Sequence, residues 1–432
     1  MRRFVWKNLK EDVRDTALAR PQAISDSSLI WDVREILSDV RENGDEAVKR
    51  LTQRFDGVKV DTLEVSTETL KEAWNALPAS DKSVVERARR NIKSFHDAQI
   101  QDPIEVETEP GVLCRRETRA IETAGLYVPG GTAPLVSTLL MLAVPAKVAG
   151  VQNRIVVTPP GKDGKVDSTI LAAAYRCKVS RLFVMGGAQA IGALAYGTET
   201  APKCDKIFGP GNAWVAAAKS FVAQEAGGPA IDMPAGPSEA MVLADDAADP
   251  IFVASDLLSQ AEHDTVAQVI CVASSAEVAD KIEAELENQV SGLPRESIAR
   301  ESLEHGRMFI ADERADIIDI INRYAPEHLI IQLRDPDTYV GAIRNAGSIF
   351  LGPWTPESVG DYASGTNHTL PTYGAARAYS GVTLESFTKY VSIQKLTKQG
   401  LKRLGPVVER LAEMEGLDAH KRAVSLRLEA LS

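Results

Sequence analysis

Four short polar stretches of the chain contain four of its six histidines, together with carboxylates, amides and glycines. These stretches are residues 260–263 (QAEH), 326–328 (PEH), 360–368 (GDYASGTNH) and 415–420 (EGLDAH). Such a set offers nitrogen and oxygen ligands for a divalent metal, and also acid and base groups. Because the stretches contain no cysteine, they suit zinc, and also manganese or cobalt.

Two of the candidate ligands are expected on one helix. Asp249-Pro250 is a good N-cap and first-turn pair, and the apolar pattern continues the helix to His263. Gln260 and His263 are three residues apart, so they are expected on one face near the end of this helix.

The other candidate ligands come from later stretches. His420 is expected in the first turn of the last helix, capped by Asp418, where the helix dipole favours the neutral imidazole that binds metals. Asp361 supplies an anionic oxygen from a glycine-flanked loop. Taken singly, each of these residues also fits a structural, hydrogen-bonded role.

The adjacent residues Glu327 and His328 are a candidate acid-base pair. A carboxylate beside an imidazole orients the ring or activates water, and a well-placed general base contributes about 10²- to 10⁴-fold to a rate. Spacing alone fits a surface turn before the strand expected at 329–331 equally well.

The elements that must position these residues fall into four stretches. Residues 1–124 are expected to be a mainly helical region that packs on the second of two α/β lobes. The first lobe (125–237) and the second (238–383) each alternate short β-branched runs with helical segments, which is typical of parallel βα units. Residues 384–432 return to a helical pattern. Two short helices are not stable alone, so they are expected to dock on the body or on a partner subunit.

Glycine-rich turns follow the expected strands of the first lobe, at 186–189 (GGAQ) and 209–212 (GPGN). In an open parallel sheet, ligands bind beyond the carboxyl ends of the strands, where glycines let backbone amides approach a pyrophosphate. A dinucleotide is therefore a reasonable ligand. Such turns also serve as simple connectors, and no GxGxxG motif is present.

Composition excludes several classes of protein. A length of 432 residues with 44% hydrophobic and 25% charged residues is ordinary for a soluble globular protein of two or three domains. The net charge of −11 argues against nucleic acid as a partner. No apolar run is long enough to span a membrane, and no signal peptide is expected. The four scattered cysteines fit reduced residues in the cytoplasm.

Several blocks of the sequence resemble those of the histidinol dehydrogenase family. They are residues 125–131 (GLYVPGG), 206–212 (KIFGPGN), 231–239 (IDMPAGPSE), 255–263 (SDLLSQAEH) and 360–368. The resemblance runs in order from about residue 25 to the C-terminus. It implies an aldehyde-dehydrogenase-like architecture of two incomplete Rossmann-like lobes. It also implies a homodimer with shared active sites, one zinc ion per subunit, and NAD-dependent oxidation of L-histidinol through L-histidinaldehyde to L-histidine, the last part of histidine biosynthesis.

The resemblance also assigns roles to individual residues. It implies that Glu327 and His328 are catalytic. The implied zinc ligands, which also contact the substrate, are Gln260, His263, Asp361 and, from the other subunit, His420. The further implied substrate contacts are Ser238, His328, His368 and Glu415. The implied NAD contacts are Tyr127, Gln189 and Asn212.

Three other functions are compatible with parts of this pattern. A paralogue on the same scaffold oxidises another small polar alcohol, such as a sulfonated diol, although Glu415 and His368 suit a cationic amine and an imidazole. A metal-dependent hydrolase uses the same ligands without NAD. A non-catalytic binding protein has no use for an adjacent acid-base pair.

Overall fold

A computed structural model describes residues 1–20, 27–130, 134–234 and 236–431 of the chain. Gly131 and Ala235, which belong to the blocks 125–131 and 231–239, lie outside the described residues. The described residues form two compact units. The first unit contains residues 1–98 and 122–387, and the second contains residues 99–121 and 388–432.

One parallel sheet of the first unit is built mainly from the second series of strands. Its order is β1 (Arg2–Val5), β12 (Arg307–Ile310), β11 (Gln268–Ala273), β10 (Glu239–Ala244), β13 (His328–Gln332) and β14 (Ser348–Leu351). The sheet is flanked by α9 (Pro250–Ala261), α10 (Ala276–Val290), α11 (Glu296–His305) and α12 (Arg314–Tyr324), with the short α13 (Asp337–Val340) before β14.

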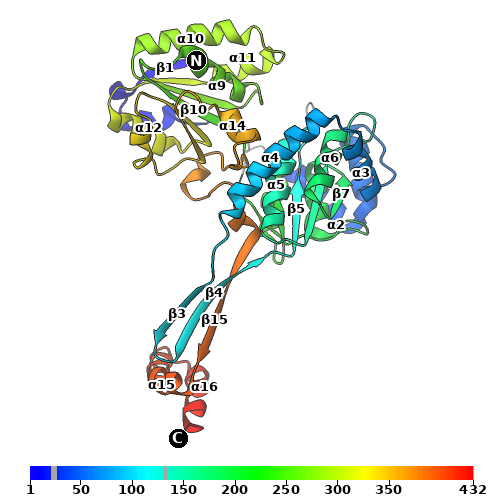
Figure 1. Cartoon of the computed structure of the whole chain (residues 1–432), viewed down its shortest axis with the longest axis vertical. Coiled ribbons are helices and arrows are strands. Elements are labelled where there is room, and N and C mark those ends of the chain that lie inside the picture. Colours follow the sequence, from blue (N-terminus) through cyan, green and yellow to red (C-terminus); the bar gives the residue numbers. More distant parts are fainter. Residues whose placement is uncertain (21–26, 131–133, 235, 432) are drawn as a thin grey trace. The chain divides into compact units, whose positions relative to one another are not determined.

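Alternating side chains of β10 show why this sheet is covered on both faces. Ala240 and Val242 pack in a core with residues of α9, α10 and α11, whereas Met241 and Leu243 pack in a second core with residues of α12. Successive side chains of a strand point to opposite faces, so a run that is apolar throughout requires a helical layer on each side. Figure 1 shows α9, α10 and α11 on one side of this sheet and α12 on the other.

The other large sheet of the first unit is built from the first series of strands. Its order is β2 (Glu64–Val65), β7 (Arg181–Val184), β6 (Asn153–Thr158), β5 (Thr123–Tyr127), β8 (Lys206–Phe208) and β9 (Ala230–Ile231), and only the short β2 is antiparallel to its neighbour in the described residues. The predicted α/β fold with two parallel lobes is therefore confirmed.

Helices from two parts of the chain surround this sheet. They are α5 (Val136–Val148), α6 (Ser168–Cys177), α7 (Gly187–Tyr196) and α8 (Ala213–Gln224), joined by α2 (Ser27–Asp56), α3 (Thr67–Ala76) and α4 (Ala79–Asp97). Helix α2 contacts α7 and α8, α3 contacts α6, and α4 contacts α5. The N-terminal region thus differs from the expectation that it packs on the second lobe. Of the described N-terminal residues, the first twenty lie against the β10 sheet, with β1, the 3₁₀ turn Trp6–Asn8 and α1 (Glu11–Ala17) among them.

The second unit contains strands where helices were expected. Strands β3 (Ile104–Glu109), β4 (Val112–Ala120) and β15 (Thr388–Leu396) form an antiparallel sheet that leads to α15 (Lys398–Met414) and α16 (Asp418–Glu429), as Figure 1 shows. Strands β3 and β15 are largely exposed, although Ile104 and Val106 of β3 alternate with glutamates as in a half-buried strand. Helices α15 and α16 pack on each other.

Within residues 1–20, 27–130, 134–234 and 236–431, no helix is both long and apolar enough to cross a bilayer.

Candidate active site

His328 is the first residue of β13, and both it and Glu327 are buried. The ring Nδ1 lies 3.1 Å from the carbonyl oxygen of Glu239 at the start of β10. A carbonyl oxygen only accepts hydrogen bonds, so Nδ1 carries a proton and donates it. In the neutral ring, the basic atom is therefore Nε2.

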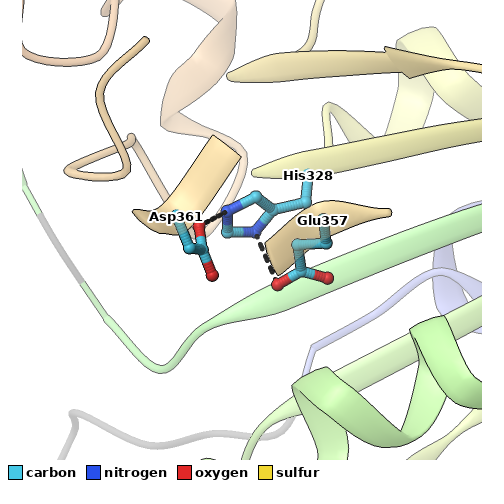
Figure 2. A group of neighbouring side chains, drawn as sticks. All are labelled: His328, Glu357 and Asp361. Atoms are coloured by element: carbon cyan, nitrogen blue, oxygen red, sulfur yellow. Dashed lines mark ion pairs between the residues drawn. The ribbon is translucent and has the colours of Figure 1, made fainter. Parts of the chain in front are cut away.

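Carboxylates lie around both ring nitrogens of His328. Asp361 Oδ1 is 3.5 Å from Nε2, whereas Glu357 Oε1 and Glu327 Oε2 are each 3.7 Å from Nδ1. Figure 2 shows Asp361 beside one ring nitrogen and Glu357 beside the other. Both come from α14 (Glu357–Tyr362), where a spacing of four residues places them on one face.

The protonation of this cluster follows from burial and mutual charge. Burial raises the pKa of Glu327 and of Glu357 to about 8. Burial opposes charge on His328, but the carboxylates of Glu357, Glu327 and Asp361 outweigh it and hold the pKa of His328 well above its usual value. Burial also opposes charge on Asp361, but His328 and two other histidines lower its pKa. Near neutral pH the cluster therefore favours a charged His328 and Asp361, with protons held on the glutamates.

Glu357 did not emerge from the sequence patterns. It follows a proline at the start of a short helix, and nothing in its immediate neighbours marks a buried carboxylate. Its spacing of four residues from Asp361 was the signal that was available.

The predicted metal ligands of the first unit fit a divalent cation. Both side-chain atoms of the Gln260 amide are buried and have no hydrogen-bond partner in the described structure. An unsatisfied buried amide is costly, and ligation through its oxygen would satisfy it. The low pKa of Asp361 keeps that carboxylate charged, and desolvation lowers the pKa of His263, which favours the neutral imidazole.

Helix α9 is slightly shorter than the sequence predicted. It ends at Ala261, and His263 follows its C-cap, with its backbone N–H donating to the Gln260 carbonyl at 3.2 Å. His263 is exposed as a whole residue, but its ring is close enough to Asp361 for the carboxylate to influence its pKa. Helices α9 and α14 also contact each other, so Gln260, His263 and Asp361 come from adjoining elements of the first unit.

His328, Glu357 and Asp361 also form a group that is compact enough to hold a metal ion. The arrangement of their atoms fits ion pairing better. His328 Nδ1 already donates to Glu239, and Asp361 and Glu357 each lie beside one nitrogen of the ring.

His368 supports the position of Asp361. Its Nδ1 donates to the Asp361 carbonyl oxygen at 2.8 Å, and its Nε2 lies 3.2 Å from the Thr138 hydroxyl. Burial lowers the pKa of His368, so the neutral ring accepts from Thr138. Both ring nitrogens of this predicted substrate-binding residue are thus engaged with protein.

The other predicted substrate contacts lie in different places. Ser238 directly precedes β10 and the buried Glu239. Glu415 is the exposed C-cap of α15, and His420 lies exposed in the first turn of α16; both belong to the second unit. Asp418 is the first residue of α16, not its cap, because Leu417 holds the N-cap position and makes no side-chain cap bond.

The predicted cofactor residues Tyr127, Gln189 and Asn212 line one pocket of about 350 Å³. Asn212 caps α8 by accepting from the Val215 N–H at 3.2 Å, and the Gly187 N–H at the start of α7 donates to the Tyr127 hydroxyl at 3.2 Å. Two helix N-termini thus adjoin the pocket at the carboxyl ends of β7 and β8. This combination suits the phosphates of a dinucleotide.

The turn after β8 requires glycine at position 209. Its φ is +119°, and a side-chain carbon added there would lie 2.1 Å from the Tyr127 carbonyl oxygen. The turn is also held by a buried ion pair: Lys219 Nζ donates to the Gly209 carbonyl at 2.9 Å, and Asp232 accepts from the Gly209 N–H at 2.8 Å.

Comparison with known proteins identifies the family. The family model described as histidinol dehydrogenase matches residues 19–428. The chain belongs to the histidinol dehydrogenase family. The histidinol dehydrogenase of Aliivibrio fischeri is 47% identical over all of this chain and 98% of its own length. That of Mannheimia succiniciproducens is 50% identical over 99% of each chain.

A solved histidinol dehydrogenase has the same fold. The crystal structure of the enzyme from Elizabethkingia anophelis covers all of this chain and 98% of its own, with 43% identity and a TM-score of 0.95. Membership of the histidinol dehydrogenase family confirms the predicted enzyme class, an NAD-dependent alcohol and aldehyde oxidoreductase of histidine biosynthesis. The hydrolase and the non-catalytic binding protein are thereby disfavoured.

Proposed function

We propose that this chain oxidises L-histidinol to L-histidine through L-histidinaldehyde, with NAD as the oxidant and one zinc ion per subunit. The observation that carries this proposal is the buried His328, whose basic Nε2 faces Asp361 in the neighbourhood of the unsatisfied Gln260. Oxidation of an alcohol needs a base for the hydroxyl proton, and His328 would supply it. A substrate that carries an imidazole can be held by a cation, which the candidate ligands beside His328 would bind.

His328 is proposed as the general base of both oxidations. Its Nδ1 is held by Glu239, so its Nε2 accepts the hydroxyl proton as the substrate is oxidised. A cation held by Asp361 would offset one of the negative charges that raise the pKa of His328, and this would favour the neutral, proton-accepting ring.

Glu327 is proposed to act mainly in the second oxidation. There it helps to activate the water that hydrates the aldehyde, and a pKa of about 8 lies near the pH at which a general base works best. Cys177 and Cys204 are not suited to a nucleophilic role, because desolvation raises the pKa of each buried thiol to about 12.

Zinc would be held by Gln260, His263 and Asp361, with His420 supplied by the partner subunit. When bound, it supplies positive charge that positions the imidazole and amino nitrogens of histidinol. Ser238, His368 and Glu415 are the proposed further substrate contacts, of which His368 acts at least through its hydrogen bond to Asp361. NAD, which accepts the hydride, would bind at Tyr127, Gln189 and Asn212.

A homodimer with shared active sites is part of the proposal. Helix α15 exposes Val407, Leu411 and Met414 in the second unit, which favours burial against a partner subunit. No nucleic acid or membrane is proposed as a partner. The proposed location is the cytoplasm, which suits four free cysteines.

The stoichiometry of NADH tests the proposal. We expect two NADH per L-histidinol, with L-histidine as the end product, measured by absorbance and by chromatography of the product. Removal of metal by a chelator is expected to abolish turnover, and added zinc is expected to restore it. If only one NADH forms and free aldehyde accumulates, the proposed second oxidation is wrong. If metal-free protein keeps full activity, the proposed zinc dependence is wrong.

A further inference from the structure

Glu239 holds both members of the proposed catalytic pair through its own backbone. Its N–H donates to Glu327 Oε2 at 2.8 Å, and its carbonyl oxygen accepts from His328 Nδ1 at 3.1 Å. The position of this single residue therefore sets the place of the Glu327 carboxylate and the orientation and tautomer of the His328 ring.

The side chain of Glu239 is fixed in turn by Arg20. Only 1% of the Glu239 side chain and 13% of the Arg20 side chain are exposed. Arg20 Nε donates to Glu239 Oε1, and Arg20 Nη2 donates to Glu239 Oε2 at 2.8 Å. The two parallel bonds of a guanidinium to a carboxylate restrict orientation as well as position.

Other contacts join this pair to three further elements. Arg20 Nη2 donates to the Tyr324 carbonyl at the end of α12, and its guanidinium carbon lies 3.9 Å from the centroid of the Tyr324 ring. The backbone N–H of Tyr373 donates to Glu239 Oε1 at 2.9 Å. The Tyr324 hydroxyl donates to Gln268 Oε1 at 3.0 Å. The network thus spans the starts of β10 and β11 and the end of α12.

We propose that Arg20 is a positioning residue for the reaction, acting through Glu239 on Glu327 and His328. This inference rests on the catalytic roles proposed for that pair. The hydrogen bonds of Arg20 go to the Glu239 carboxylate and to the backbone carbonyls of Tyr324 and Ala325. Arg20 keeps the Glu239 backbone where its N–H and carbonyl can hold the base and the water-activating carboxylate, and small displacements of such groups cost rate.

A merely structural role is the alternative, in which Arg20 only compensates the buried charge of Glu239. Removing one partner of a buried ion pair is destabilising in either case. The two roles differ in the turnover of the molecules that remain folded. A structural role lowers stability and leaves their kcat unchanged, whereas a positioning role lowers kcat and leaves KM unchanged.

The experiment compares Arg20→Met, Arg20→Lys and Arg14→Met in the full-length, zinc-loaded enzyme. For Arg20→Met we expect kcat per folded molecule to fall about 10- to 100-fold on both histidinol and histidinaldehyde, with unchanged KM for either substrate and NAD. Arg20→Lys should be intermediate, because an ammonium lacks the guanidinium fork. Unchanged kcat in Arg20→Met would overturn the proposal.

Arg14→Met is the matched control. Arg14 belongs to the same N-terminal segment, and its Nη1 lies 3.4 Å from Asp319 Oδ2 of α12. Its guanidinium carbon lies 4.8 Å from the centroid of the Trp6 ring, and within the described residues its hydrogen bonds go to Glu11 and Asp319, not to Glu239. Its loss should lower the melting temperature and leave kcat unchanged. An equal fall in kcat in this variant would show that any loosening of the segment slows turnover, which contradicts a specific role for Arg20.

Two further comparisons address an Arg20→Met variant that fails to fold and the catalytic roles proposed for Glu327 and His328. If Arg20→Met does not fold, the double variant with Glu239→Gln removes the unpaired charge; slow turnover supports positioning, and wild-type turnover overturns it. Glu327→Gln and His328→Asn are measured in parallel. If both keep wild-type turnover, the proposed catalytic roles fail and the inference fails with them. If they lose turnover while Arg20→Met keeps it, only the inference fails.

Discussion

At the scale of single residues, the site depends on a fixed tautomer of His328. The Glu239 carbonyl accepts from Nδ1, so Nε2 is left as the basic atom on the side of Asp361. The environment of Glu327 is different. Its carboxylate accepts a hydrogen bond from the Glu239 N–H, and burial raises its pKa to about 8. These environments suit two different proton transfers.

Separate measurement of the two oxidations tests this division. Glu327→Gln is expected to slow oxidation of supplied histidinaldehyde more than oxidation of histidinol, because only the aldehyde step needs activated water. His328→Asn is expected to slow both by about 100-fold or more, the loss of a general base. The readout is kcat for each substrate. Equal and small effects on both oxidations would contradict these roles.

Asp256 provides a residue-scale prediction of pH dependence. This buried carboxyl on α9 accepts from Gln332 Nε2 at 2.7 Å, and burial raises its pKa to about 6 from an ordinary value of 3.8. The native state therefore binds the proton more tightly than the unfolded state. Above pH 6 the buried carboxylate of Asp256 is ionised, and its full cost lowers the free energy of unfolding. This cost disappears as the pH falls below 3.8, the pKa of the carboxyl in the unfolded chain.

Asp256→Asn should remove this cost while it keeps an oxygen for Gln332. We expect the free energy of unfolding of the variant, relative to wild type, to improve by about 1 kcal/mol more at pH 7.5 than at pH 5. Urea unfolding at fixed protein and zinc concentrations measures the difference. A gap that is constant across this range would show that Asp256 does not titrate there.

At the scale of elements, the two sheets place their functional residues at different ends. Tyr127, Gln189 and Asn212 lie at or beyond the carboxyl ends of β5, β7 and β8, as the rule for open parallel sheets predicts. Glu239 and His328 instead begin β10 and β13, whose paired starts bring the two residues together.

The turn between β8 and α8 gives an element-scale prediction. Gly209→Ala should push its new carbon against the Tyr127 carbonyl and disturb the pocket, so we expect KM for NAD to rise about tenfold or more, with KM for histidinol unchanged. Gly227→Ala is the control, because Gly227 has a φ of +74° and no neighbour within 4 Å. Gly227→Ala therefore introduces the strain of a positive φ without a clash against a neighbouring atom. Similar kinetics in both variants would reject the contact with Tyr127.

At the scale of the whole molecule, the chain divides into a large unit with both parallel sheets and a small unit made of two distant segments. The proposed zinc ligands Gln260, His263 and Asp361 lie in the large unit, whereas His420 lies in the small one. A shared site in a homodimer would join ligands from both units and from both subunits.

Subunit mixing tests this arrangement. Asp361→Ala and His420→Ala should each be inactive as homodimers. In a re-associated heterodimer, one site carries both defects and the other carries neither. Random pairing makes about half of the dimers mixed, so roughly a quarter of wild-type activity should return. No recovered activity in dimers shown to be mixed would place His420 in the site of its own chain.

The sequence by itself determined the α/β class, two series of βα units and the polar stretches around Gln260, His328 and Asp361. These features depend on residue types and apolar spacing within short segments, which can be seen in the sequence. It did not predict β1, β2, β3, β4 or β15, although Ile104 and Val106 of β3 alternate with glutamates. These strands lie in regions of the chain whose neighbouring segments have a helical pattern.

Only the tertiary structure decided which groups surround His328. Glu357, Glu239 and Arg20 approach it, directly or through another residue, from α14, β10 and the N-terminal segment, and Arg20 is 219 residues from Glu239 in the chain. Hydrogen bonds and charges act over a few ångströms in space, whereas sequence spacing reports only neighbours along one element. The fixed tautomer, the raised pKa of the glutamates and the Arg20–Glu239 pair are therefore consequences of the packing of distant segments.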